Sequence, residues 1–121
     1  MVNKPKNKGT AYESLWADRL KTVWPGLRRA EANSKSRDLR GAPFPIELKH
    51  RRRWEIPEWS RRLHELNARG WLLIVRYGDS RVKGAPPEVM VMPAVMGELL
   101  LKVAFEAEPE LLADALGKVA A

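Results

Sequence analysis

The chain has 121 residues, a length that fits one domain with a single core. It contains no cysteine, which excludes disulfides, thiolate metal sites and a cysteine nucleophile and suits a reducing, cytoplasmic location. The formal charge is +7, and all of the excess lies in the first half, because residues 1–62 carry 16 basic and 7 acidic side chains. Such a balance attracts phosphate backbones, but many small basic proteins bind no nucleic acid, so charge alone leaves the partner open.

Residues 1–8 are basic and polar, and we expect a flexible arm there without the features of a secretory signal. The remaining residues, 9–121, are expected to form a single domain. Thr10 is a candidate N-cap for a first helix, whose apolar residues recur at helical spacing until Pro25 and Gly26 end it. Residues 27–31 are predicted to form a short strand, and the polar residues 33–37 a loop.

Residues 44–49 alternate between apolar and polar side chains, which predicts a strand. Pro57 suits the first turn of a second helix, and Gly70 is a candidate for its C-cap. Residues 71–75 are continuously apolar, a pattern typical of a central strand that is covered on both faces. A loop over 78–87, a strand over 89–92 and two closing helices over 94–105 and 109–119 complete the chain. The order α-β-β-α-β-β with C-terminal helices predicts an α/β fold with a mixed central sheet flanked by helices.

The residues that indicate chemistry surround the first long strand. Glu47 and Lys49 are two residues apart, so they project from the same face of the strand. Asp38 precedes Glu47 by nine residues across a bend at Gly41-Ala42-Pro43, and either a hairpin or a kinked strand could return it to the side of Glu47. Two carboxylates at one place repel each other, but together with a backbone carbonyl they suit a hard divalent cation such as Mg²⁺ or Mn²⁺.

The pattern Asp38…Glu47-Leu48-Lys49 resembles the signature of PD-(D/E)xK nucleases, most closely that of small archaeal-type and phage Holliday junction resolvases. The resemblance covers residues 9 to about 76 and implies a restriction-endonuclease-like core. It implies that Asp38 and Glu47 bind the metal and that Lys49 assists catalysis. The early helical glutamate of the family maps onto Glu13, which would then join both the metal site and the catalytic group.

The sequence also departs from the family pattern. Arg37 stands before Asp38 where many relatives have proline. Several relatives carry a glutamine on the helix after the ExK strand, and no glutamine occurs in this region. The role of that glutamine is therefore either absent or taken by Arg62.

The resemblance implies a Mg²⁺-dependent endodeoxyribonuclease that hydrolyses phosphodiester bonds in branched DNA during recombination and acts as a homodimer, in a prokaryotic or phage-infected host cell. The apolar segments after residue 88 are candidates for the dimer interface. The residues expected to contact DNA are arginines near the candidate site: Arg37, Arg40, Arg51, Arg52, Arg53 and Arg62. Two alternatives stay open, namely another nuclease on the same core (restriction-like, nicking or repair) and a DNA-binding recombination accessory protein without activity.

Each candidate residue also has an ordinary structural explanation. Thr10 and Glu13 have the spacing of a capping box, in which Glu13 would bond to the Thr10 amide. Glu47 and Lys49 could form a solvated ion pair on an exposed face, which contributes ~0–1 kcal/mol. Asp38 could cap a turn, and the three consecutive arginines after the strand could simply be solvated. These alternatives make different predictions about burial and about the neighbours of each side chain.

Overall fold

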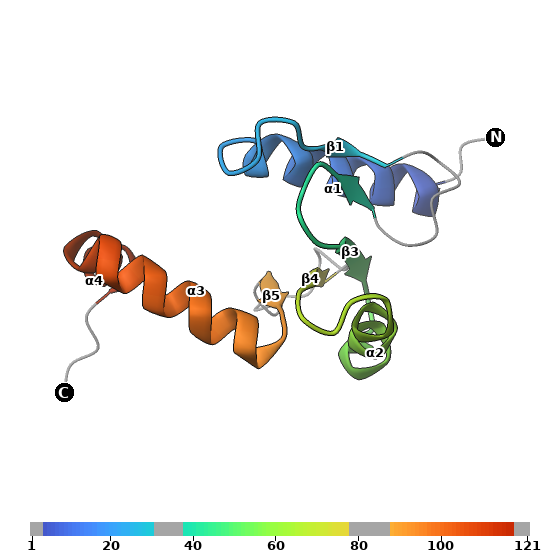
Figure 1. Ribbon diagram of the computed structural model, residues 1–121. Coiled ribbons are helices and arrows are strands. Elements are labelled where there is room, and N and C mark those ends of the chain that lie inside the picture. The colour runs from blue at the N-terminus through green and yellow to red at the C-terminus, as the bar shows by residue number, and fades with distance from the viewer. Residues whose placement is uncertain (1–3, 31–37, 78–87, 118–121) are drawn as a thin grey trace.

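The computed structural model describes residues 4–30, 38–77 and 88–117. Its elements, in chain order, are α1 (Lys4–Leu20), β1 (Arg28–Arg29), β2 (Leu39–Arg40), β3 (Ile46–Arg51), α2 (Ile56–Leu66), β4 (Leu72–Tyr77), β5 (Val89–Val91), α3 (Ala94–Ala107) and α4 (Pro109–Leu116). Figure 1 shows the strands at the centre, α1 and α2 beside them, and α3 and α4 extending away. The predicted α/β class is confirmed.

The five strands form one mixed sheet in the order β1-β2-β3-β4-β5. Neighbouring strands are antiparallel except for β3 and β4, which pair in parallel from Ile46↔Leu72 to Arg51↔Tyr77. Parallel strands need a crossover connection, and α2 supplies it. The short strand β2 adds a pairing partner for β3 that the alternation pattern alone did not predict.

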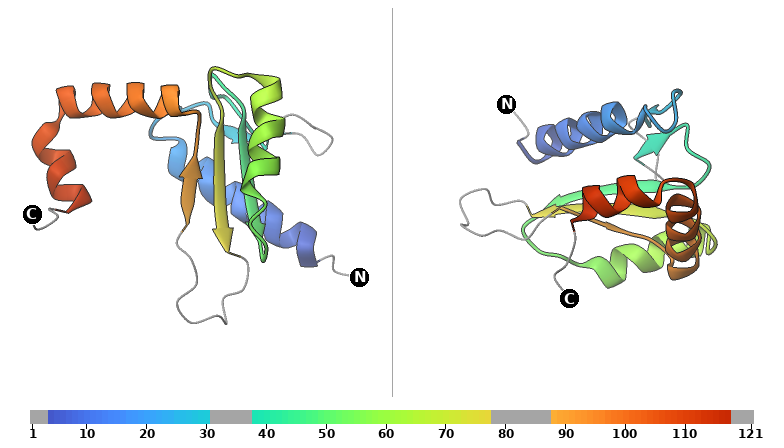
Figure 2. Two further views of the ribbon diagram at one scale, coloured as in Figure 1. Left: turned by 90° about the horizontal axis from the view of Figure 1, so that it is seen from below. Right: turned by 90° about the vertical axis from the view of Figure 1, so that its left-hand side faces the viewer.

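The sheet is covered on both faces, as the apolar run 71–75 predicted. On one face, Leu72 and Ile74 pack with Tyr12 and Trp16 of α1. On the other face, the alternate residues of β4 pack against the buried side of α2. Figure 2 shows α1 and α2 on opposite sides of the strands. The residues from Leu72 to Val75 therefore alternate between the two cores, which explains why this part of β4 has no polar face.

The ends of two helices differ from the prediction. Helix α1 begins at Lys4, within the segment expected to be a flexible arm. Its start lies six residues before Thr10, the predicted N-cap. Pro5 lies in its first turn, where a missing N–H breaks no helical hydrogen bond. Helix α2 ends at Leu66 with Asn67 as its C-cap, so Gly70 is not the cap. Gly70 instead packs against Phe44, where a Cβ atom would lie 3.5 Å from the Phe44 Cβ.

The two C-terminal helices do not close the domain. Neither α3 nor α4 contains a buried residue. Figure 2 shows α3 leaving the sheet beside β5 and α4 turning away at the far end of α3. We call α3 and α4 the C-terminal arm, and the described residues up to Val91 the sheet body. The prediction of two helices is confirmed, but they contribute no buried residue to the core.

Candidate active site

The position of Asp38 is fixed by its backbone. Its N–H donates to the Ile46 carbonyl of β3 at 2.9 Å, and its carbonyl accepts from the Ala30 N–H at 2.9 Å. The bend that follows uses Gly41 at a φ of 105°, and a Cβ atom there would lie 2.6 Å from the Gly26 carbonyl oxygen. Only glycine fits this conformation and this contact. The hairpin expected between Asp38 and Glu47 is therefore present.

The Asp38 side chain reaches the middle of the ExK segment. Its Oδ2 accepts a hydrogen bond from the backbone N–H of Leu48 at 2.8 Å. Leu48 lies between Glu47 and Lys49, so the carboxylate sits at the edge of β3 at their level. In a strand, the N–H and C=O of one residue leave from the same edge. The Leu48 carbonyl therefore also projects from the edge that faces Asp38.

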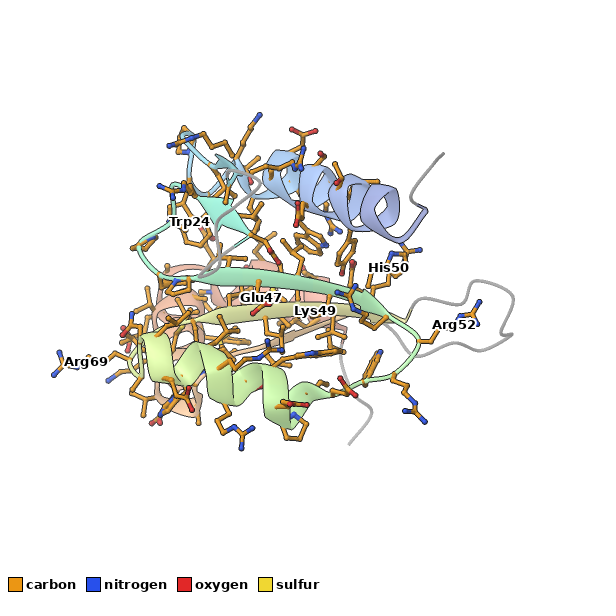
Figure 3. All side chains as sticks on the ribbon, turned by 90° about the vertical axis from the view of Figure 1, so that its right-hand side faces the viewer. Trp24, Glu47, Lys49, His50, Arg52 and Arg69 are labelled. Carbon is orange, nitrogen blue, oxygen red and sulfur yellow. The ribbon has the colours of Figure 1, made fainter. Side chains whose placement is uncertain are left out.

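Glu47 and Lys49 lie on the face of β3 that α2 covers (Figure 3). Their side chains form an ion pair with 2.9 Å between Lys49 Nζ and Glu47 Oε1, and they are only 22 and 14 % exposed. The ammonium also lies 5.7 Å from the centre of the buried Trp59 ring, within the range of a cation–π contact. This burial disagrees with the alternative of a solvated pair on an open face.

The electrostatic environment of Asp38 is unfavourable for its charge. Burial, together with the negative charges of Glu13 and Glu47, raises the pKa of Asp38 from 3.8 to about 6. The Leu48 N–H and the Lys49 charge act in the opposite direction but do not offset it. Three carboxylates thus interact electrostatically around one point, which is unusual unless a cation or a proton compensates them.

Glu13 takes part in this electrostatic cluster from the other side of the sheet. It lies within α1 rather than in its first turn, so the capping-box explanation does not hold for it. Its Oε2 accepts a hydrogen bond from Arg29 Nε at 3.3 Å. Sequence reasoning missed Arg29 as the partner of Glu13, because strand β1 gave no pattern that placed it opposite α1.

The arginines expected to bind DNA are placed differently from one another. Arg51, Arg52 and Arg53 are exposed at the end of β3, just beyond Lys49, and Figure 3 shows Arg52 pointing away from the sheet. Arg62 is exposed on α2, whereas Arg40 is partly buried on β2. Arg37 lies outside the described residues, so its contribution stays a prediction.

Part of this donor set consists of the oxygen ligands that a divalent cation prefers. Within the described ranges, no group of three or more His, Cys, Asp or Glu side chains is arranged to hold a metal ion. The fit therefore rests on fewer protein ligands: Asp38, Glu47 and the Leu48 carbonyl. Mg²⁺ accepts such a set, because it prefers oxygen ligands and retains several waters. Glu13, paired with Arg29, stays a predicted rather than an observed member.

A second polar cluster was not predicted at all. Glu88, just before β5, accepts hydrogen bonds from Tyr12 Oη at 2.7 Å and from Trp16 Nε1 at 3.0 Å. Arg19 pairs with the same carboxylate at 3.5 Å. Burial acts to raise the pKa of Glu88, but these hydrogen bonds and the charges of Arg19 and Arg76 outweigh it and lower the pKa. We call this group the Glu88 clasp. No sequence signal could reveal it, because Tyr12, Trp16 and Arg19 precede Glu88 by 69 to 76 residues.

Comparison with protein-family models, curated proteins and solved structures found no significant match. In the part of the chain that the structure describes, none of the helices has the length and apolar character needed to cross a bilayer. The assignment of a function therefore depends on the geometry of the site.

Proposed function

We propose that this protein is a metal-dependent endonuclease that hydrolyses phosphodiester bonds in DNA, with a core of the restriction-endonuclease type. One observation supports this proposal most strongly: the Asp38 carboxylate accepts a hydrogen bond from Leu48, between Glu47 and Lys49. The Asp38 carboxylate thus lies beside the residue that separates Glu47 from Lys49, and it interacts electrostatically with both. The half-buried ion pair of Glu47 and Lys49 beside a buried carboxylate adds to this support.

Each side chain has a distinct part in the proposed reaction. Asp38 and Glu47, together with the Leu48 carbonyl, would hold Mg²⁺ or Mn²⁺, and Glu13 would add negative charge nearby. The bound ion would supply Lewis-acid stabilisation of the phosphoryl group and lower the pKa of a coordinated water. Lys49 is held close by Glu47 and Trp59, from where its ammonium can orient the attacking water or neutralise charge that develops on the phosphate.

The exposed arginines set the expected substrate contacts. Arg51, Arg52 and Arg53 follow the strand that carries Glu47 and Lys49, so they are suited to hold phosphates on either side of the bond that is cut. Branched DNA is the leading substrate because of the resemblance to junction resolvases. Contacts to phosphates alone do not distinguish it from linear duplex.

The test compares cleavage of a four-way junction with that of a linear duplex of the same sequence in Mg²⁺, at matched enzyme concentration. We expect wild-type protein to cut the junction and Asp38→Asn to lose at least about 100-fold in rate, because a metal ligand is lost. The matched control is Asp18→Asn, which changes an exposed carboxylate on α1 that forms an ion pair with Lys21. Binding of both variants to the junction is measured in parallel by fluorescence anisotropy.

The outcomes separate the alternatives. Equal cutting of junction and linear duplex would retain the nuclease and remove the resolvase. Salt-sensitive binding with no cleavage in Mg²⁺ or Mn²⁺ would favour a DNA-binding accessory protein. Unchanged cleavage by Asp38→Asn would overturn the proposed site.

A further inference from the structure

Three hydrogen-bond donors of the Glu88 clasp form a single stripe on α1. Tyr12, Trp16 and Arg19 follow one another at helical spacing, and all three donate to the Glu88 carboxylate. The Tyr12 and Trp16 side chains are buried in the core, and the Arg19 guanidinium lies over the Trp16 ring, 4.0 Å from its centre. We call these three residues the α1 donor stripe. Packing against the sheet and this cation–π contact orient its donors toward one point.

The α1 donor stripe lies apart from the candidate active site. The Tyr12 ring is 5.3 Å from the ring of His50, which projects toward α1, whereas Glu47 and Lys49 lie on the α2 side of β3 (Figure 3). In the sheet, His50 pairs with Arg76 of β4, and the charge of Arg76 also acts on the Glu88 carboxylate. A second positive charge therefore stands near the stripe, on the opposite face of the sheet from the candidate catalytic group.

The Glu88 carboxylate matches this set of donors only in part. Its Oε2 accepts the two short bonds from Tyr12 and Trp16, at 2.7 and 3.0 Å. Its Oε1 accepts from Arg19 Nη1 at 3.5 Å, which is longer than the ~2.7–3.2 Å of most N–H···O bonds. Arg19 and Arg76 carry two positive charges and Glu88 one negative charge, so the three groups together retain a charge of +1.

A phosphate group matches the same donors more fully. It carries about −1.5 to −2 charges near pH 7 and offers more acceptor oxygens than a carboxylate does. Guanidinium groups bind phosphate oxygens with short, charge-assisted bonds. The place is also open to water, because the side chains of Arg19 and Glu88 are 53 and 28 % exposed. A phosphate and the Glu88 carboxylate repel each other, so one excludes the other.

We propose that the α1 donor stripe, together with Arg76, is a phosphate-binding site, and that Glu88 occupies it as an internal competitor. The site goes beyond the proposed nuclease activity and does not depend on it. Two sources supply this chemistry: free inorganic phosphate and the terminal phosphate of a nucleic acid strand. Both present the oxygens and the charge that the stripe and Arg76 would bind.

The test follows the Trp16 indole N–H by ¹H–¹⁵N nuclear magnetic resonance while inorganic phosphate is added at constant ionic strength. The Trp16 signal is assigned by its absence in Trp16→Phe. We expect a saturable shift, with an affinity at least about tenfold higher in Glu88→Ala than in wild type, or ~1.4 kcal/mol. The Trp71 indole, which donates to His64, is an internal control and should not shift.

Two arginine substitutions in the Glu88→Ala background test the donors. Adding Arg19→Gln is expected to lower the phosphate affinity at least about tenfold. Adding Arg61→Gln, the matched control on the exposed side of α2, should leave it unchanged. A 5′-phosphorylated dinucleotide and its dephosphorylated form identify the source. Tighter binding of the phosphorylated form than of inorganic phosphate indicates a strand end, and equal binding indicates a free phosphate.

The proposal is overturned if phosphate up to about 50 mM, where even ~10 mM affinity would be evident, does not shift the Trp16 indole of Glu88→Ala. Equal affinities of wild type and Glu88→Ala would also overturn it, because Glu88 would then not compete. Equal losses from Arg19→Gln and Arg61→Gln would show an effect of net charge and have the same consequence. Far-ultraviolet circular dichroism checks the fold, and if Glu88→Ala is unfolded, Glu88→Gln replaces it with the same criteria.

Discussion

The sheet body and the C-terminal arm contain similar apolar side chains but use them in different ways. In the body, α1 and α2 cover both faces of the sheet, and Leu73, Ile74 and Val75 are completely buried. In the arm, α3 and α4 have no buried residue. The comparison teaches that amphipathic or apolar helices in the sequence identify surfaces to be covered, but not the chain that covers them.

The largest expected change in stability comes from replacing a leucine by alanine, and comparing this substitution in the body and in the arm tests the difference between them. We expect Leu73→Ala to lower the free energy of unfolding by about 2–5 kcal/mol, because it leaves a cavity in a closed core. Leu99→Ala, in the arm, is expected to change it by less than about 0.5 kcal/mol in the monomer. Urea denaturation at high dilution measures both. Similar losses would mean that the arm is part of the folded core.

At the candidate site, substitution of Asp38 is expected to raise the free energy of unfolding, by less than Leu73→Ala lowers it. Burial and neighbouring negative charges raise the pKa of Asp38 from 3.8 to about 6, so the native state binds the proton more tightly than the unfolded chain. The penalty for the charge is absent below pH 3.8, grows as the pH rises and is complete above about pH 6. Asp38→Asn removes it and keeps an acceptor for the Leu48 N–H.

We therefore expect Asp38→Asn to stabilise the metal-free protein by about 1–3 kcal/mol at pH 8 and to have no effect at pH 3.5. Thermal unfolding at both pH values, with chelator present, measures the difference. A loss of stability at pH 8 would show that the carboxylate has a structural role instead. No comparable gain is expected from Asp114→Asn in the arm, where the side chain is exposed.

Within the sheet body, the Glu88 clasp ties the residue before β5, the strand that leads into the arm, to α1. Glu88→Gln is expected to cost about 1–2 kcal/mol, because charge-assisted hydrogen bonds from Tyr12 and Trp16 become neutral ones. The pKa of Glu88 is lowered from its ordinary value of 4.5. This stabilisation is therefore complete above pH 4.5 and is lost as the pH falls through the lowered pKa. Chemical denaturation of both proteins at pH 7 and pH 3 measures it, and a difference that persists at pH 3 would contradict the explanation.

The smallest effect concerns DNA affinity. Arg52→Ala is expected to weaken binding by about 1 kcal/mol or less and to lower the slope of log K against log salt by about 1, while stability stays unchanged. Arg69→Ala is the matched control, since Figure 3 shows Arg52 and Arg69 pointing away from opposite ends of the molecule. Equal effects of the two substitutions would mean that binding follows net charge and not this end of β3.

Much of the body could be predicted from the sequence, because local patterns determine it. The alternation before Lys49 gave β3, the apolar run 71–75 gave the two-sided strand β4, and the Gly41 bend gave the hairpin that returns Asp38 to β3. The hydrogen bond from the Leu48 N–H to the Asp38 carboxylate follows from that hairpin. The function proposed for this group stays a prediction.

The rest depends on contacts that are distant in sequence. The position of Trp59 beneath Lys49 requires the packing of α2 on β3, and Arg29 opposite Glu13 requires the packing of α1 on β1. The apolar spacing of residues 94–116 predicted helices but not their separation from the core. Periodicity indicates which side of a helix or strand is apolar, but it does not indicate how far that element lies from the core.

The hairpin at Asp38 also has a consequence for the order of folding. Its hydrogen bond to Leu48 joins residues ten apart, whereas the Tyr12–Glu88 bond joins residues 76 apart. Closing a short loop loses less chain entropy than closing a long one. During synthesis, the Asp38–Lys49 segment can therefore begin to pair before β5 has been translated, and refolding experiments should find the docking of β5 to be the slower event.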